Sequence, residues 1–197
     1  MTRKMRSSWA LTSTLLVVSA GVWAEGQSSS LLADTCAGCH GTNGSSVGPA
    51  SPTIAGMSVE TFLEAMKGYK TGTRPSTIMD RLTKGYTDEQ IKEMAEYFSK
   101  QKFERFPQEV DTAKVKAGKK LADEHCERCH EDGGREDEDG SGILAGQWLP
   151  YLRFSMEDFQ SGAREMPKKM KKAIETMVGE AGPDSIESVV QFYAGQK

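Results

Sequence analysis

The chain has 197 residues and a formal net charge of −3, and 37% of its residues are hydrophobic. This length suits one large domain or two small ones. The slight acidity excludes the basic surface that nucleic-acid binding requires.

The N-terminal segment, residues 1–24, is typical of a secretory signal peptide. A basic stretch at residues 3–6 precedes a mostly apolar stretch, and Val22 and Ala24 are the small residues expected before a cleavage site. An uncleaved membrane anchor is the alternative, but the apolar run is shorter than the ~20 residues that span a bilayer. We therefore predict export, cleavage near Ala24 and no membrane span in the mature chain.

Every cysteine of the chain belongs to a C-x-x-C-H motif. The motif residues are Cys36, Cys39 and His40, and Cys126, Cys129 and His130. This is the attachment pattern of c-type haem, in which two thiols on one helical turn bond to the porphyrin vinyl groups and the histidine binds iron. A zinc site would need ligands from both pairs, and a redox C-x-x-C would lie in a βαβ context that is not visible here. The sequence predicts two covalently bound haem c groups.

The two motifs belong to a tandem repeat. Cys36 and Cys126 are 90 residues apart. The other segments related by this offset are IAG and LAG at 54–56 and 144–146, and TGTR and SGAR at 71–74 and 161–164. A period of this length is domain-sized, so we predict one haem module in each half.

Apolar residues at helical spacing predict helices throughout the mature chain. The stripes are Phe62, Leu63, Met66 and Tyr69, then Ile91, Met94, Ala95 and Phe98, then Ile186, Val189, Val190 and Tyr193. Thr87 with Gln90 predicts a capping box, and Asp184 with Glu187 is a second candidate. The predicted boundaries are 1–24 for the signal peptide, 25–102 for the first domain, 103–113 for the linker and 114–197 for the second domain.

Methionine is the expected second axial ligand of each iron, because it suits electron transfer. Met79 lies between two predicted helices, where a loop could return it to the haem. The repeat offset brings Met79 to Lys169, one residue from Met170, so Met170 is preferred and Met166 is the alternative. His125 precedes its motif directly and is expected at the surface.

Four segments, CAGCHGTNGSSVGPASPTIAG, STIMDRLTKGY, CERCHEDGG and ILAGQWLPYL, resemble dihaem cytochromes of the c4 type. Within that group the likeness is to the cytochrome subunits of flavocytochrome c sulfide dehydrogenases, from about Leu31 to the C-terminus. The resemblance implies an all-α fold of two tandem cytochrome c-type domains, each wrapped around one haem c. It also implies His/Met ligation, by His40 with Met79 and His130 with Met170.

The same resemblance implies a periplasmic electron-transfer subunit that is not catalytic alone. Its partner would be a flavoprotein subunit that oxidises sulfide at FAD, and its electrons would pass through both haems to an external acceptor. A free dihaem carrier that serves a terminal oxidase is the alternative. A dihaem peroxidase is a third hypothesis, which the methionine in each half disfavours.

Two loops suggest an orientation for this partner. The loop after the first motif has no charged residue between Gly41 and Met57, and depletion of charge is typical of an interface core. The matching loop, Glu131 to Asp139, is acidic and is expected to face solvent or to make a transient contact. These features predict that the first haem lies nearer the flavin.

Overall fold

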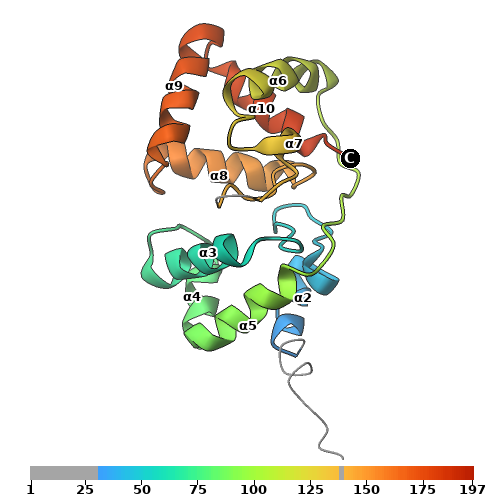
Figure 1. The fold of residues 1–197 in the computed structure, drawn as a ribbon, viewed down its shortest axis with the longest axis vertical. Helices are drawn as coiled ribbons and strands as arrows, with labels where there is room; N and C mark the ends of the chain where they lie inside the picture. The colour runs from blue at the N-terminus through green and yellow to red at the C-terminus, as the bar shows by residue number, and fades with distance from the viewer. Residues whose placement is uncertain (1–30, 138–139) are drawn as a thin grey trace, which may run out of the picture.

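The computed structural model describes residues 31–137 and 140–197. Figure 1 shows two helical lobes stacked along the long axis and joined by an extended segment at one side. No strand occurs in these residues, and none of their helices is long and apolar enough to cross a bilayer. The predicted signal peptide, residues 1–24, lies outside the described residues.

Each lobe is one helical domain. The first domain contains α2 (Ala37–His40), η1 (Thr42–Gly44), α3 (Val59–Thr71), α4 (Met79–Leu82), η2 (Thr83–Gly85) and α5 (Asp88–Phe98). The second domain contains α6 (Thr112–His125), α7 (Glu131–Gly134), α8 (Leu149–Ser161), α9 (Lys168–Ala181) and α10 (Asp184–Ala194). The prediction of an all-α chain with two tandem domains is confirmed.

The repeat is preserved in the longest matching helices, α3 and α8. Both have 13 residues, and their first residues, Val59 and Leu149, are 90 positions apart. Each ends at a glycine in the left-handed conformation, Gly72 or Gly162, with φ of 80° and 76°. A residue with a Cβ is strained there, so glycine sets the end of both helices at the same place.

The loop that follows each motif packs on the last helix of its own domain. Gly44 and Gly134 have φ of 81° and 82°, and the carbonyl of each accepts two backbone N–H groups of the IAG or LAG segment. A Cβ on Gly44 would lie 2.8 Å from the ring of Phe98, and a Cβ on Gly134 would lie 2.8 Å from the ring of Tyr193. The repeat therefore persists in backbone conformation and in packing.

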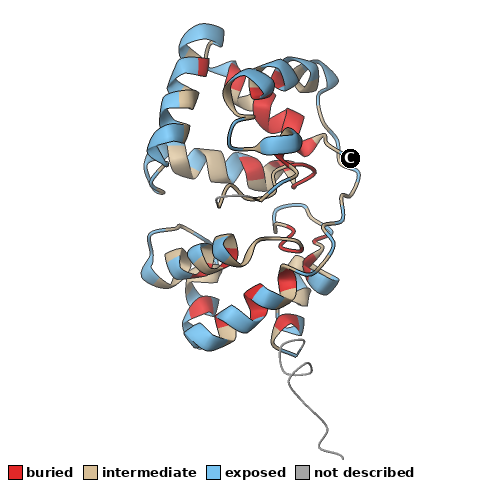
Figure 2. Cartoon of the chain, viewed as in Figure 1, coloured by how far each residue is buried: buried red, intermediate tan, exposed pale blue. Residues whose placement is uncertain are grey.

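Each domain has its own apolar core (Figure 2). The first core contains Ala33, Ile54, Phe62, Met66, Ile91, Met94, Ala95 and Phe98. The second contains Ala122, Leu149, Leu152, Met177, Val189, Val190, Phe192, Tyr193 and Ala194. In the second domain α10 packs mainly on α6, where a Cβ on Gly118 would lie 1.9 Å from Ser188 O.

The two predicted capping boxes have different outcomes. Thr87 Oγ1 accepts a hydrogen bond from Gln90 N at 3.2 Å, and Gln90 Oε1 accepts one from Thr87 N at 2.9 Å, which confirms the first box. The second box is wrong, because Pro183 is the N-cap and Asp184 already lies in the first turn of α10. Glu187 is therefore free to pair with an arginine of α8.

Reciprocal hydrogen bonds join the domains at Gln147, whose side chain is buried. Gln147 Oε1 accepts from Thr53 N at 2.8 Å, and Gln147 Nε2 donates to Thr53 O at 2.9 Å. Beside it, Trp148 Nε1 donates to Ser46 O at 3.1 Å, and the indole lies against Gly48. These contacts give the loop after the first motif a fixed position on the second domain.

Asp137 makes a second link between the domains. Its carboxylate accepts hydrogen bonds from Ser58 N and Thr61 Oγ1, both at 2.7 Å, and from Gly142 N at 2.8 Å. Ser58 is the N-cap of α3, so the carboxylate also lies at the positive end of that helix. The acidic loop was expected to face solvent, and for Asp137 this expectation is wrong.

Candidate functional site

The two C-x-x-C-H motifs adopt the same tight helical turn. In each, the first cysteine carbonyl accepts from the backbone N–H of the second cysteine and of the histidine. These distances are 3.2 and 2.9 Å at Cys36 and 3.0 and 3.0 Å at Cys126. The first motif lies on α2, and the second lies between α6 and α7. Both thiols and the histidine therefore come from one turn in each domain.

No disulfide joins any of the four cysteines. Cys36 and Cys126 are half-buried, and burial raises the pKa of each thiol, whereas Cys39 and Cys129 are exposed. Among the described residues no cluster of three or more potential metal ligands includes a cysteine. The two motifs therefore do not combine into a zinc site, and each is left to hold its own group.

His40 is prepared to bind a metal through Nε2. Its Nδ1 donates to Pro52 O at 2.8 Å, which sets the tautomer and leaves the Nε2 lone pair free. Burial lowers the pKa of this imidazole, so the ring is neutral near pH 7. A neutral imidazole with a hydrogen bond at its other nitrogen is what iron ligation requires.

His130 differs from His40 in its hydrogen bonding. Its pKa is also lowered by burial, and its ring lies 6.0 Å from that of Tyr193 at a steep angle. Its Nδ1, however, is buried without a hydrogen-bond partner in the part of the chain that is described. An unsatisfied buried ring nitrogen is unusual, and it means that nothing in the described chain fixes the tautomer of His130 as Pro52 does for His40.

The candidate axial methionines lie at matching points after α3 and α8. Met79 is the first residue of α4 and packs on the first core. Met170 is in the first turn of α9 and Met166 is in the segment before it, and both are half-buried. Met177 is fully buried in the second core. The choice between Met170 and Met166 stays a prediction.

Two positions of the neutral loop of the first domain are covered by the second domain, whereas Val47 and Ala50 in the same loop stay exposed. Ser46 is 0% exposed and Thr53 is 2% exposed, because they contact Trp148 and Gln147. The expectation that this loop is free for a partner is therefore wrong at these positions. The contact with the second domain explains why these covered positions carry no charged residue.

His125 was expected at the surface, and this expectation is wrong. Its side chain is 9% exposed, because α9 packs beside the end of α6. Its Nε2 lies 3.6 Å from Glu180 and 4.0 Å from Glu124, both of which are exposed. The histidine therefore lies between α6 and α9, beside two carboxylates.

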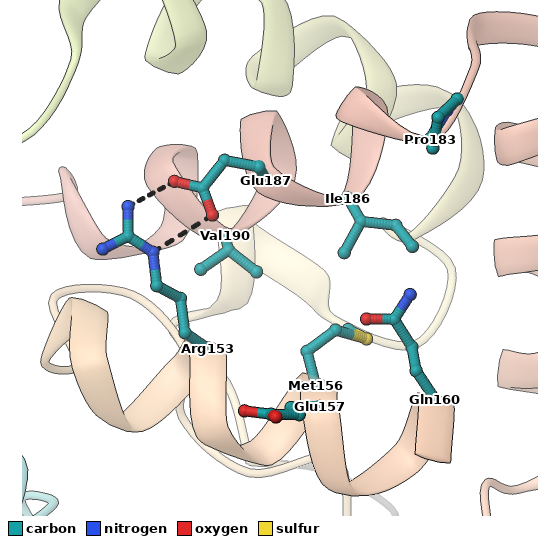
Figure 3. Close-up of a pocket in the computed structure, with 8 residues that line it drawn as sticks. All are labelled: Arg153, Met156, Glu157, Gln160, Pro183, Ile186, Glu187 and Val190. Carbon is teal, nitrogen blue, oxygen red and sulfur yellow. Dashed lines mark hydrogen bonds and ion pairs between the residues drawn. The ribbon is translucent and has the colours of Figure 1, made fainter.

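A separate cavity of about 230 Å³ lies between α8 and α10 (Figure 3). At its rim Arg153 donates to both carboxylate oxygens of Glu187. Its lining residues are Arg153, Met156, Glu157, Gln160, Pro183, Ile186, Glu187 and Val190. None of them belongs to a C-x-x-C-H motif, so this cavity is not the place where the thiols hold their group.

Known proteins share both the motifs and the fold. The family model for cytochrome c matches residues 24–102. Cytochrome c4 of Azotobacter vinelandii is 31% identical over 167 residues, which cover 77% of this chain and 78% of that protein. The chain belongs to the cytochrome c4 family. The crystal structure of cytochrome c4 from Pseudomonas stutzeri has a TM-score of 0.72 at 24% identity, and the match covers 87% of this chain and 98% of that one.

A shorter match has higher identity. The cytochrome subunit of sulfide dehydrogenase from Chlorobaculum tepidum is 48% identical over 68 residues. This match covers 34% of the c4-type chain described here and 61% of that subunit. Membership of the c4 family implies covalent haem c, and the two motifs support a count of two.

The residues present fit haem c in each domain. Both motifs supply two free thiols and a neutral histidine from one turn, and His40 already has the hydrogen bond that orients it. Reasoning from the sequence found these residues. It missed the polar residues of the domain boundary, Gln147, Trp148 and Asp137. The signal for Gln147 and Trp148 was their place directly after LAG.

Proposed function

We propose that this c4-type cytochrome is the periplasmic electron-transfer subunit of a sulfide-oxidising flavoprotein complex. The observation that carries the proposal is the pair of C-x-x-C-H turns, each with a half-buried histidine of lowered pKa, in one chain whose two domains are joined by hydrogen bonds. The match to a sulfide dehydrogenase cytochrome subunit supports the choice of partner. FAD is expected on the partner only, and the chain is not catalytic by itself.

Each residue of the two sites has one task. Cys36 and Cys39 anchor the first haem and His40 binds its iron, while Cys126, Cys129 and His130 do the same for the second haem. Haem c supplies one-electron chemistry at iron. Met79 and Met170 are proposed as the second ligands, which would close both irons to substrates. Electrons would enter from the flavin, cross the boundary near Gln147, and leave to a soluble acceptor.

Axial ligation can be tested by substitution. Thioether ligation gives a weak charge-transfer band near the red end of the oxidised spectrum, so Met79→Ala should remove about half of it. Met170→Ala should remove the other half, and Met166→Ala should leave it intact. The opposite result for Met170 and Met166 would make Met166 the ligand.

A free dihaem carrier is the second candidate, because the match to cytochrome c4 extends over most of the chain. Native purification separates the two functions. Haem and flavin absorbance should elute together, and sulfide should reduce both haems in that fraction. Elution of the dihaem chain without flavin, together with electron donation to an oxidase, would favour the free carrier. Peroxide turnover by the half-reduced protein would instead identify a peroxidase.

A further inference from the structure

The C-terminal ends of α6 and α9 meet next to the second C-x-x-C-H motif. α6 ends at His125, which directly precedes Cys126, and Glu180 is the last residue but one of α9. At this point one ligand atom each from Glu124, His125 and Glu180 lie within 4.8 Å of one another. No other such group of three potential metal ligands occurs in residues 31–137 and 140–197. The cluster uses none of the residues assigned to either haem, so the haem sites do not account for it.

The histidine is the buried member of this cluster. Its side chain is 9% exposed, whereas those of Glu124 and Glu180 are 70% and 61% exposed. His125 Nε2 lies 3.6 Å from Glu180 Oε2 and 4.0 Å from Glu124 Oε2, and both distances are longer than a hydrogen bond. Neither ring nitrogen makes a hydrogen bond to another described residue. A polar side chain buried to this degree usually has such a partner, and this one is directed at two carboxylates.

The negative charge of the cluster is not neutralised by lysine or arginine. Neither Glu124 nor Glu180 pairs with these residue types in the described part of the chain. The neighbouring Asp123 differs, because its carboxylate is paired with Lys119. Both glutamates also lie in the last turn of a helix, where unpaired carbonyl groups disfavour an acidic side chain and favour a cation. Two carboxylates and two negative helix ends therefore converge on one imidazole.

The donor set is suited to a divalent transition metal. Zn²⁺ is bound by imidazole nitrogen and carboxylate oxygen at about 2.0–2.2 Å, which places neighbouring ligand atoms of a tetrahedral site about 3.3–3.6 Å apart. His125 Nε2 and the Glu180 oxygen already have this separation, and the Glu124 oxygen needs to move by only a few tenths of an ångström. Ca²⁺ and Mg²⁺ prefer ligand sets made of oxygen alone, so the histidine favours the softer ion. Because both carboxylates are exposed, water can complete the coordination.

The first domain has a different link at the equivalent place. His125 is 90 residues after Thr35, which directly precedes the first motif. Thr35 Oγ1 is hydrogen-bonded to the hydroxyl of Tyr86 at 2.8 Å, and Tyr86 follows α4 and η2, the elements that begin with the candidate methionine. In the second domain α9 contains both Met170 and Glu180. In each domain the residue before the motif is therefore directed at the part of the chain that carries the candidate axial ligand.

We propose that Glu124, His125 and Glu180 form a binding site for a divalent transition-metal ion with the ligand preferences of Zn²⁺. The ion neutralises the two carboxylates and ties the end of α9 to the end of α6. It thereby holds the helix that contains Met170 against the haem-attachment turn, as the threonine–tyrosine hydrogen bond does in the first domain. The site is structural, and it is independent of the flavoprotein partner and of both haem irons.

The first test measures binding to the holoprotein with both haems attached, after dialysis against a chelator. Equilibrium dialysis against Zn²⁺, followed by metal analysis, should find one bound Zn²⁺ per chain in addition to the haem iron. Glu180→Gln removes one ligand from an exposed position and should weaken Zn²⁺ binding at least about tenfold, since even indirect partners of a metal contribute this much. Glu175→Gln changes a similarly exposed carboxylate of the same helix, which pairs with Lys171, and is the matched control with unchanged affinity.

The second test is thermal unfolding of the same holoproteins. Zn²⁺ should raise the unfolding temperature of the second domain in the native protein and in Glu175→Gln, because a ligand that binds only the folded state stabilises it. The rise should be absent from Glu180→Gln. In metal-free protein, Glu180→Gln should unfold at no lower temperature than the native chain, because the substitution removes repulsion between two carboxylates.

Three outcomes would overturn the proposal. One is Zn²⁺ binding that is absent from the native protein or equally strong in Glu180→Gln. Another is displacement of the bound Zn²⁺ by Mg²⁺ at the same concentration, because the cluster would then be an acidic surface that attracts any divalent cation. The third is a metal-free Glu180→Gln protein that unfolds at a lower temperature, with no effect of Zn²⁺ on the native chain, because an ion pair with protonated His125 would then be the role of the cluster. Failure of flavin to co-purify would leave the expected results unchanged.

Discussion

The two domains share their frame up to the end of α3 or α8 and differ after it. Up to Gly72 and Gly162 the helices and loop turns match at an offset of 90 residues. Beyond that point the first domain forms the short α4 and η2, whereas the second forms the 14-residue α9. The shared part is packed on the last helix and allows little change in length. The segment that carries the candidate methionine therefore takes a different local structure in each domain, although Met79 still packs on the first core.

The histidines of the two motifs also differ between the domains, in a single hydrogen bond. His40 donates to the carbonyl of Pro52, whereas the position 90 residues later is Gly142 and His130 has no such partner in the described chain. A proline-containing loop therefore orients the first imidazole. The second domain uses its corresponding loop for another purpose, since Asp137 and Gly142 in it are bonded to each other.

The largest expected effect is confined to the second domain. Gly118→Ala should lower the free energy of unfolding by about 3 kcal/mol or more, because the new Cβ would lie 1.9 Å from the backbone oxygen of Ser188. Calorimetry of the holoprotein should show the transition of the second domain at a lower temperature. Gly179→Ala, in the open interior of α9, is the control and should stabilise slightly. If the second domain unfolded at the same temperature in both variants, the close packing of α6 on α10 would be contradicted.

The next prediction measures how similar the domains are. Gly44→Ala and Gly134→Ala should each lower the free energy of unfolding by about 2–3 kcal/mol, because both combine a positive φ with a Cβ 2.8 Å from an aromatic ring. Gly72→Ala has a positive φ but open space, and should cost only about 1 kcal/mol. Thermal unfolding of the three variants checks this order. A large difference between the Gly44 and Gly134 variants would mean that the repeat is not energetically equivalent.

At the domain boundary, Gln147→Met should lower the free energy of unfolding by about 2 kcal/mol. Methionine leaves Thr53 N and Thr53 O buried without partners, and unsatisfied buried groups cost more than the bond is worth. The equivalent residue of the first domain is already Met57, so this change makes the two halves alike. Small-angle scattering should show a more extended holoprotein. Gln160→Met, at an exposed site on α8, should leave both shape and stability unchanged.

The smallest effect should depend on pH. Arg153 hydrogen bonds hold the pKa of Glu187 below its usual range, so the pair stabilises the folded protein above the unfolded pKa of about 4.3. This stabilisation is lost as pH falls through the lower pKa of the folded state. Glu187→Gln should therefore cost less than about 1 kcal/mol at pH 7, because Arg153 is half-exposed, and almost nothing near pH 3. A destabilisation of the same size at both pH values, measured by thermal unfolding, would exclude the ion pair as its cause.

Local patterns in the sequence determined the cofactor class, the repeat and the helical frame. Cys-x-x-Cys-His specifies its chemistry within one turn, and the stripe of α5 with its Thr87 box needs only neighbouring residues. Where a tertiary contact competes with a local pattern, the prediction from the sequence was wrong. Asp184 was predicted to cap α10, but Pro183 holds that position and Glu187 is bonded to α8.

Only the tertiary structure decided how the halves meet. A neutral loop is suited equally to a partner protein and to a second domain, and only the three-dimensional contact shows that Trp148 and Gln147 cover it at Ser46 and Thr53. An acidic loop is suited to solvent, yet Asp137 binds the start of α3 because that helix end offers unpaired N–H groups. The arginines of TGTR and SGAR are ordinary surface residues in the sequence. Folding brings Arg74 to the hydroxyl of Tyr151 in the other domain, because contacts between distant segments are not encoded by any one segment.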